Sequence, residues 1–112
     1  MRYRDVVTVV RAPEVAGPDG STAPDWTVPE GSLTVTDYPG ELQPISSTEE
    51  IVGQDRTEST HKAFLPAEAD VTSADRLRHQ GLEYWVDGAP EDHRHRGRPH
   101  HIEAFCFRVT GG

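Results

Sequence analysis

The most regular alternation of hydrophobic and polar residues in the chain lies between residues 75 and 87. One face of its second half is apolar and consists of Leu82, Tyr84 and Val86. Side chains at every other position share one face of a strand, so this face is expected to pack on a core. Gly81, which follows Gln80, can adopt the positive φ that a tight turn requires. The pattern therefore predicts a β-hairpin that turns at Gln80-Gly81.

Four further segments have the composition of strands, and they are residues 5–12, 33–45, 59–65 and 100–110. The first contains the valine pairs Val6-Val7 and Val9-Val10, which predict apolar contacts on both faces, with either the core or a neighbouring subunit. The second is expected to be interrupted by a turn or bulge at Pro39-Gly40. The last alternates between two apolar sets, Phe105, Phe107 and Val109 on one face and Ile102, Ala104 and Cys106 on the other.

Six strands in this order predict an all-β fold, a small antiparallel β-barrel or sandwich that forms a single domain over residues 1–112. Long loops are expected at residues 13–32, 46–58 and 88–99. The first loop is rich in proline and glycine and contains four acidic residues and no basic one. Trp26 in its middle is expected to lie back on the barrel as an anchor.

Composition narrows the classes of function. The 112 residues carry a formal net charge of −8, whereas a protein that grips nucleic acid presents a basic surface to the phosphates. An acidic surface instead lets DNA pass without adhering, although it also serves simply to keep a protein soluble. No apolar run is long enough to span a bilayer, and the start of the chain lacks the apolar region of a secretory signal. With one cysteine, no intrachain disulfide can form.

A group of histidines and arginines lies between residues 93 and 101. Zinc would need three or four ligands with a supporting shell, but Arg94, Arg96 and Arg98 are interleaved with the histidines and would repel a cation. We therefore predict no metal site. The three arginines are expected instead to contact an acidic neighbour, for which the loop at 13–32 of an adjacent subunit is a candidate.

The sequence contains no motif that predicts catalysis or cofactor binding, neither a nucleophile elbow nor a phosphate-binding glycine-rich loop. Cys106 is expected to be a small buried hydrophobe, and Asp75 and Arg76 are expected to form an ion pair. Trp85 should point outward between Glu83 and Asp87, either as a contact surface for a partner or beneath a loop. These features fit a protein that is not an enzyme and has no cofactor.

Several phrases of the sequence resemble the head–tail joining proteins of long-tailed bacteriophages, which are also called head-closure or stopper proteins. The phrases are D-V-V-T-V-V-R, T-D-Y-P-G-E-L-Q-P-I-S, S-T-H-K-A-F-L-P, D-R-L-R-H-Q-G-L-E-Y-W-V-D-G and H-H-I-E-A-F-C-F-R-V. They are spread over nearly the whole chain. The resemblance implies a small β-barrel that assembles into a homo-oligomeric ring, twelve-fold or six-fold, in the neck of the virion.

The resemblance also implies partners and a gate. The partners would be the portal or its adaptor on one side and the tail terminator or tail tube on the other, while packaged double-stranded DNA passes through without specific binding. The ring would assemble in the host bacterial cytoplasm and involve no membrane. The segment that matches the channel gate contains Glu49, Glu50, Ile51, Val52, Gly53, Gln54 and Asp55. Contacts to other subunits or partners would involve Trp26, Trp85, Arg94, Arg96 and Arg98.

Two alternatives remain open from the sequence. One is a related tail-completion or adaptor protein of the neck, which would differ in its position along the axis. The other is a small barrel that binds a ligand or metal through residues 93–101.

Overall fold

The computed structural model describes residues 5–45, 60–95 and 98–109, with the backbone alone described at 93–95 and 98–100. Its elements are β1 (Asp5–Arg11), β2 (Glu14–Ala16), β3 (Thr22–Pro24), the 3₁₀ turn η1 (Glu30–Ser32), β4 (Thr34–Pro44), β5 (His61–Pro66), β6 (Arg76–His79), β7 (Leu82–Val86), β8 (Glu91–His95) and β9 (Arg98–Arg108). The described residues contain no α-helix, which confirms the all-β prediction.

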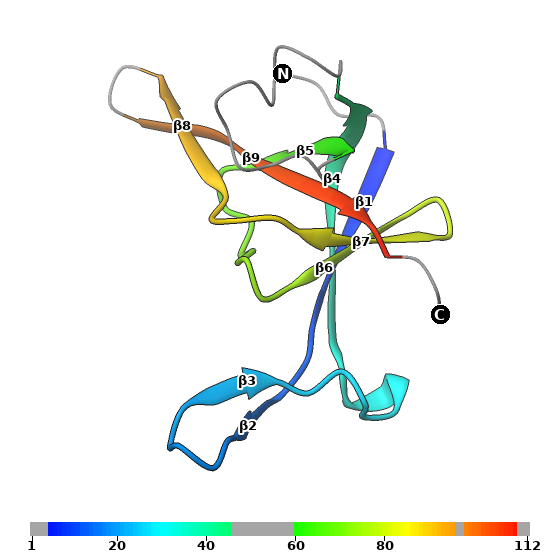
Figure 1. Ribbon diagram of the computed structural model, residues 1–112. Helices are drawn as coiled ribbons and strands as arrows, with labels where there is room; N and C mark the ends of the chain where they lie inside the picture. Colours follow the sequence, from blue (N-terminus) through cyan, green and yellow to red (C-terminus); the bar gives the residue numbers. More distant parts are fainter. Residues whose placement is uncertain (1–4, 46–59, 96–97, 110–112) are drawn as a thin grey trace.

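Six strands close into an antiparallel barrel (Figure 1). Their order is β5-β4-β1-β6-β7-β9, and β9 pairs back with β5 over six residue pairs, from His61–Cys106 to Pro66–His101. Closure leaves the barrel wall without an open edge. The barrel prediction is therefore confirmed.

The barrel interior is filled by the alternating side chains of its strands. The buried core consists of Val7, Val9, Ala63, Leu65, Ala69, Leu77, Tyr84, Val86, Ala104 and Cys106. Small residues face each other where Ala63 pairs with Ala104. Gly40 of β4 is also buried, and a Cβ on it would lie 2.5 Å from the carbonyl oxygen of Phe64. The close approach of β4 to β5 at this point therefore requires glycine.

The hairpin of β6 and β7 turns at Gln80 and Gly81 as predicted, with φ of 52° and 79°. Two positive φ values in succession are those of the type I′ turn that suits the twist of a two-residue hairpin. Tyr84 and Val86 face the core, but Leu82 is 40% exposed, so its predicted burial was wrong. Leu82 stands at the turn, beyond the end of the core.

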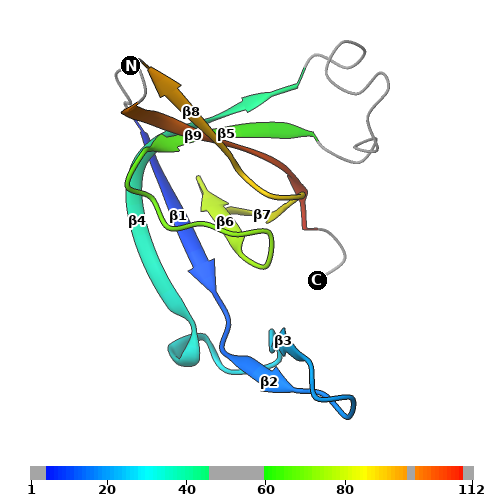
Figure 2. The ribbon, with the colours of Figure 1, turned by 90° about the vertical axis from the view of Figure 1, so that its left-hand side faces the viewer.

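Two hairpins project from the barrel. β2 and β3 form a separate two-stranded sheet at the bottom of Figures 1 and 2, while β8 extends β9 beyond the barrel at the top of both views. Residues 13–32 and 88–99 were predicted as loops, but the first range contains β2 and β3 and the second contains β8 and the start of β9. The strands were missed because β2 and β3 have three residues each, and β8 (E-D-H-R-H) has no apolar residue whose spacing could reveal it.

Two other expectations differ from the structure. β4 runs through Pro39 and Gly40 without a break, because Pro39 lies where β4 pairs with β1 alone and its missing N–H costs little. The interruption predicted at Pro39-Gly40 was therefore wrong.

The apolar contacts predicted on both faces of β1 are present at one end of the strand. Val10 is fully buried on the face opposite the core, as expected for a two-faced strand, whereas Val6 is 52% exposed.

Candidate functional site

Residues 13–32, which we call the arm, are attached to the outer wall of the barrel by an aromatic clamp. The guanidinium of Arg76 lies 3.9 Å from the ring centre of Trp85 and 4.2 Å from that of Trp26. The two indoles meet edge to face with ring centres 5.8 Å apart. A cation over the face of an aromatic ring is attracted by the ring electrons, and the indole of tryptophan gives the strongest contact of this kind. Trp26 thus anchors the arm as expected, and Trp85 is used within the subunit, beneath the arm.

Arg76 does not pair with Asp75, so the ion pair predicted between these neighbours was wrong. Adjacent residues of an extended chain point to opposite sides, so Asp75 and Arg76 diverge. Arg76 binds Glu83 across the hairpin, with Nη1 and Oε1 2.7 Å apart. Arg76 Nε and Trp26 Nε1 are buried with no hydrogen-bond partner in the part of the chain that the structure describes. Trp26 is therefore held by stacking on Arg76 and Trp85, while Arg76 is also held by its bond to Glu83.

A second clamp joins the arm to the same face of the barrel. Arg78 donates two hydrogen bonds of 2.8 Å to Glu30 of the arm and one of 2.9 Å from Nε to Glu83. These bonds lower the pKa of Glu30. Burial raises the pKa of Glu83, but its hydrogen bonds with Arg76 and Arg78 outweigh that effect and the pKa is lowered. The arm is thus tied down at both Trp26 and Glu30.

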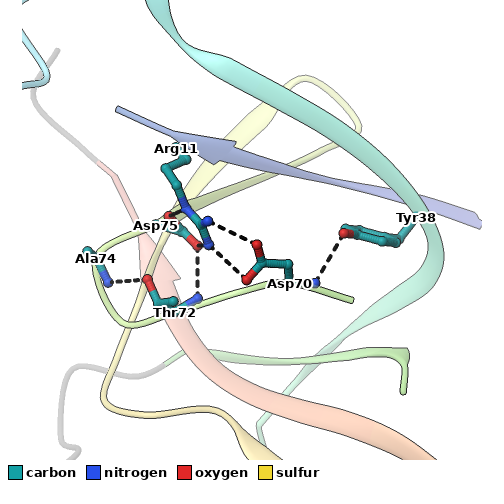
Figure 3. A network of polar contacts seen from close by, with 6 residues as sticks. All are labelled: Arg11, Tyr38, Asp70, Thr72, Ala74 and Asp75. Carbon is teal, nitrogen blue, oxygen red and sulfur yellow. Dashed lines mark hydrogen bonds and ion pairs between the residues drawn. The ribbon is translucent and has the colours of Figure 1, made fainter. Parts of the chain in front are cut away.

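The base of the arm lies against an ionic network that is buried only at Asp75 (Figure 3). Arg11 donates two hydrogen bonds, of 2.9 and 2.8 Å, to Asp75, which is completely buried, and two more to Asp70. The backbone N–H of Thr72 donates to Asp75 as well, and that of Asp70 donates to the hydroxyl of Tyr38. A hollow of about 200 Å³ borders this network. Since Asp75 and Arg11 satisfy each other, the network is structural.

A shallow groove of about 450 Å³ lies beside the β6–β7 turn. Val6 and Leu82, two of the exposed large apolar side chains, line it together with Asp5 and His79. His79 Nε2 and an oxygen of Asp5 are 2.5 Å apart, and this contact lowers the pKa of Asp5. The groove is open and weakly apolar, which fits a contact surface better than a pocket for a small molecule.

The predicted gate residues, Glu49, Glu50, Ile51, Val52, Gly53, Gln54 and Asp55, lie outside the described residues. Ile45 donates a backbone hydrogen bond of 3.0 Å to Thr60, and Thr60 donates one of 2.9 Å to Cys106. Ile45 and Thr60, which flank residues 46–59, thus lie next to each other at the end of β4 and the start of β5.

Arg94 and Arg98 lie on the β8–β9 hairpin, where Arg94 pairs with Pro99 and His95 with Arg98. Arg96 lies outside the described residues. We call residues 91–101 the ribbon. No group of three or more metal-ligating side chains occurs in the described part of the chain. None of its helical segments is long and apolar enough to cross a membrane.

Cys106 lies in the core, fully buried, as the sequence predicted. Burial raises the pKa of its thiol to about 12, so the reactive thiolate is not formed at neutral pH. Sequence reasoning missed the contacts of Arg11, Arg76 and Arg78, because their partners are distant in sequence or face them only after strands pair. The alternation around residue 77 was the one available signal, since it places Arg76 and Arg78 on the same outer face.

The chain matches no known family model. A search of curated proteins also gave no match.

Proposed function

We propose that this protein is a structural subunit of the neck of a tailed bacteriophage. In this role a ring of copies closes the DNA channel after packaging and joins the portal or its adaptor to the tail. The chain acts sterically and electrostatically and makes or breaks no covalent bond. The proposal places the protein in the virion, at the head–tail junction, after assembly in the host cytoplasm.

The observation that carries the proposal is how the acidic segment 46–59 is attached to the barrel. The residues that flank it are fixed in the wall of the closed barrel, by the bonds from Ile45 to Thr60 and from Thr60 to Cys106. The segment contains Glu49, Glu50, Asp55 and Glu58 against a single basic residue, Arg56. A loop whose flanking residues are held by a closed barrel wall is suited to narrow a channel, because functional loops are commonly carried on a rigid scaffold.

The charge and the outer surface support the same role. A net charge of −8 disfavours adhesion of the DNA phosphates, as a conduit requires. The closed barrel offers no free edge of its own, so contacts with other subunits fall to the projecting arm and ribbon and to the groove at Val6 and Leu82. Ring assembly needs two different surfaces that meet head to tail, and projections from opposite ends supply them.

The test is to locate the protein in particles. Cryo-electron microscopy and immunogold labelling of the phage that encodes the chain should place several copies at the junction of head and tail. The encoding gene should lie between capsid and tail genes. A pull-down with portal, adaptor and tail-terminator proteins would separate a head-closure protein from a tail-completion protein. Particles that carry no copy at this junction would refute the proposal.

A further inference from the structure

The strand β4 has an edge that no other strand covers along the first half of its length. β4 pairs with β1 from Thr34 to Gly40, but with β5 only from Glu41 to Pro44. In both views β4 continues beyond the closed part of the barrel toward η1, with β1 beside it (Figures 1 and 2). Among the strands that the structure describes, none pairs with residues 34–39 on the side of β5. This edge therefore lies outside the closed wall.

The edge is open because β5 ends at Pro66. The N–H of Ala69 donates a bond of 3.0 Å to the carbonyl of Pro66, so the chain turns away from β4 at this point, and Ala69 enters the core. A longer β5 in the same register would have placed its next residues opposite Tyr38 and Asp37. Residues 34–37 are exposed instead. A further strand can therefore pair with β4 in line with β5.

The backbone groups of this edge are directed for such pairing. Ile45 donates its N–H to Thr60 across the β4–β5 contact, and successive residues of an antiparallel strand direct their backbone groups to alternate sides. Val35, Asp37 and Pro39, which lie at even spacings from Ile45, therefore direct theirs away from β1. Proline suits its position because it has no N–H to leave unpaired. The N–H groups of Val35 and Asp37 remain to bind an added strand.

A small hollow of about 70 Å³ lies beside the same edge, on the face toward the core. Its lining includes Thr34, Thr36 and Tyr38 of β4, together with Arg11 and Asp70. The hydroxyl of Tyr38 accepts a hydrogen bond of 3.1 Å from the N–H of Asp70, which joins the two sides of the hollow. An added strand places every other side chain on this face. The size and the hydroxyl groups of the hollow suit a small polar side chain there.

The charges around the edge are mostly negative. Asp37 accepts a hydrogen bond of 2.6 Å from the hydroxyl of Thr8, and no basic side chain pairs with it among the described residues. On the other face the single cation of Arg11 is shared between the carboxylates of Asp70 and Asp75. Both faces therefore keep negative charge, which favours a partner with basic side chains.

We propose that residues 34–38 bind an extended segment of a partner protein by β-strand addition. The segment runs antiparallel to β4 and carries a basic residue opposite Asp37, a serine or threonine opposite Thr36, and a β-branched apolar residue opposite Val35, which is 47% exposed. A second copy of the same edge fits less well, because antiparallel pairing would bring the two Asp37 side chains close together. The inference does not depend on the neck function.

The probe is the synthetic peptide S-S-K-T-V-T-S, blocked at both ends and titrated into isotope-labelled protein. Amide signals of Val35 and Asp37 should shift, and their exchange with solvent should slow, because these N–H groups become bonded. The control peptide S-S-E-T-V-T-S should bind about tenfold more weakly, since a glutamate then lies opposite Asp37. Peptide with N-methyl groups along its bonding edge should not bind.

Variants of the protein test the same contact. Val35→Pro removes an N–H that faces away from β1, so the barrel should fold and lose the peptide, whereas Val35→Thr keeps the N–H and should bind within about twofold of wild type. Asp37→Lys should prefer the glutamate peptide. Asp19→Lys makes the same change of charge at the tip of the β2–β3 hairpin and should leave the preference as in wild type. If circular dichroism shows that Val35→Pro is unfolded, the charge reversal at Asp37 decides.

Three results would overturn the proposal. One is the absence of any shift at Val35 and Asp37 with millimolar peptide. Another is a wild-type preference between the two peptides that Asp37→Lys leaves unchanged. The third is self-association of the wild type, measured by sedimentation, that Val35→Pro abolishes, because a second copy then occupies the edge. The purified protein and peptides give this answer whether or not the chain is found in a phage neck.

Discussion

Arg11 donates two hydrogen bonds to the completely buried carboxylate of Asp75, which lies 64 positions further along the chain. The pair joins the end of β1 to the start of β6 and also fixes the loop that leads into the hairpin, through the bond from Thr72. Because Asp75 has no contact with solvent, the hydrogen bonds from Arg11 replace the hydration that its carboxylate loses on burial.

Replacing Arg11 by methionine should therefore destabilise the protein by about 3 kcal/mol, since a buried carboxylate loses its counter-charge. Urea unfolding measures the change. The control is Asp70→Asn, which removes the second carboxylate bound by Arg11, one whose side chain is 71% exposed, and should cost less than about 1 kcal/mol. Equal losses in the two variants would contradict the structural role given to Asp75.

The aromatic clamp predicts a change in fluorescence. In a Trp85→Phe background Trp26 is the sole tryptophan, and Arg76→Ala should shift its emission to the red because the arm loses its hold on the barrel. Arg76→Lys should give a similar shift, since lysine keeps the charge opposite Glu83 but not the planar stack. Emission that stays unchanged in both variants would mean that Trp26 is held by other contacts.

His61 predicts a loss of stability in mild acid. Burial lowers its pKa below the ordinary value of 6.5, so the folded state binds the proton less readily than the unfolded state does. Its contribution to stability is therefore present above pH 6.5 and declines as the pH falls below that value and through the folded pKa. Unfolding free energies measured from pH 8 to pH 5 should show this decline. His61→Phe, which keeps a ring against Tyr84, should flatten it; an equally steep profile would assign the decline to other groups.

The thiol of Cys106 should be almost inert in the folded protein. It is fully buried and its pKa is raised to about 12, so both access and thiolate formation are suppressed. Labelling with a maleimide at neutral pH should be slow in buffer and fast in guanidinium chloride. Rapid labelling in buffer would show that the β5–β9 seam of the barrel opens readily.

The gate assignment predicts a phenotype in the virion. Deleting residues 51–55 shortens a segment whose flanking residues are joined by the Ile45–Thr60 bond, so the barrel should still form. Filled heads that carry the deletion should lose DNA, which is measured as nuclease-sensitive DNA released from purified particles. Glu68→Ala, at an exposed position of the barrel outside the arm, serves as a control for general damage. Heads that retain their DNA with residues 51–55 deleted would remove the gate assignment.

The sequence by itself determined the features that depend on neighbouring residues. The alternation of Tyr84 and Val86 with polar residues, and the glycine at position 81, specify a hairpin wherever the chain is placed, because side-chain direction and turn conformation are local properties. The all-β class followed from several such segments. Burial of Cys106 followed from the apolar strand that contains it.

The tertiary structure alone decided the rest. Closure of the barrel depends on the pairing of β9 with β5. The hairpins of the arm and ribbon have too few apolar residues for their strands to be predicted from the sequence pattern. Trp26 contacts Trp85 only after distant parts of the chain lie side by side. For the same reason Asp75 binds Arg11 and not the adjacent Arg76. The physical reason is that periodicity reports which way a side chain points, whereas the partner it meets depends on how the strands are ordered in space.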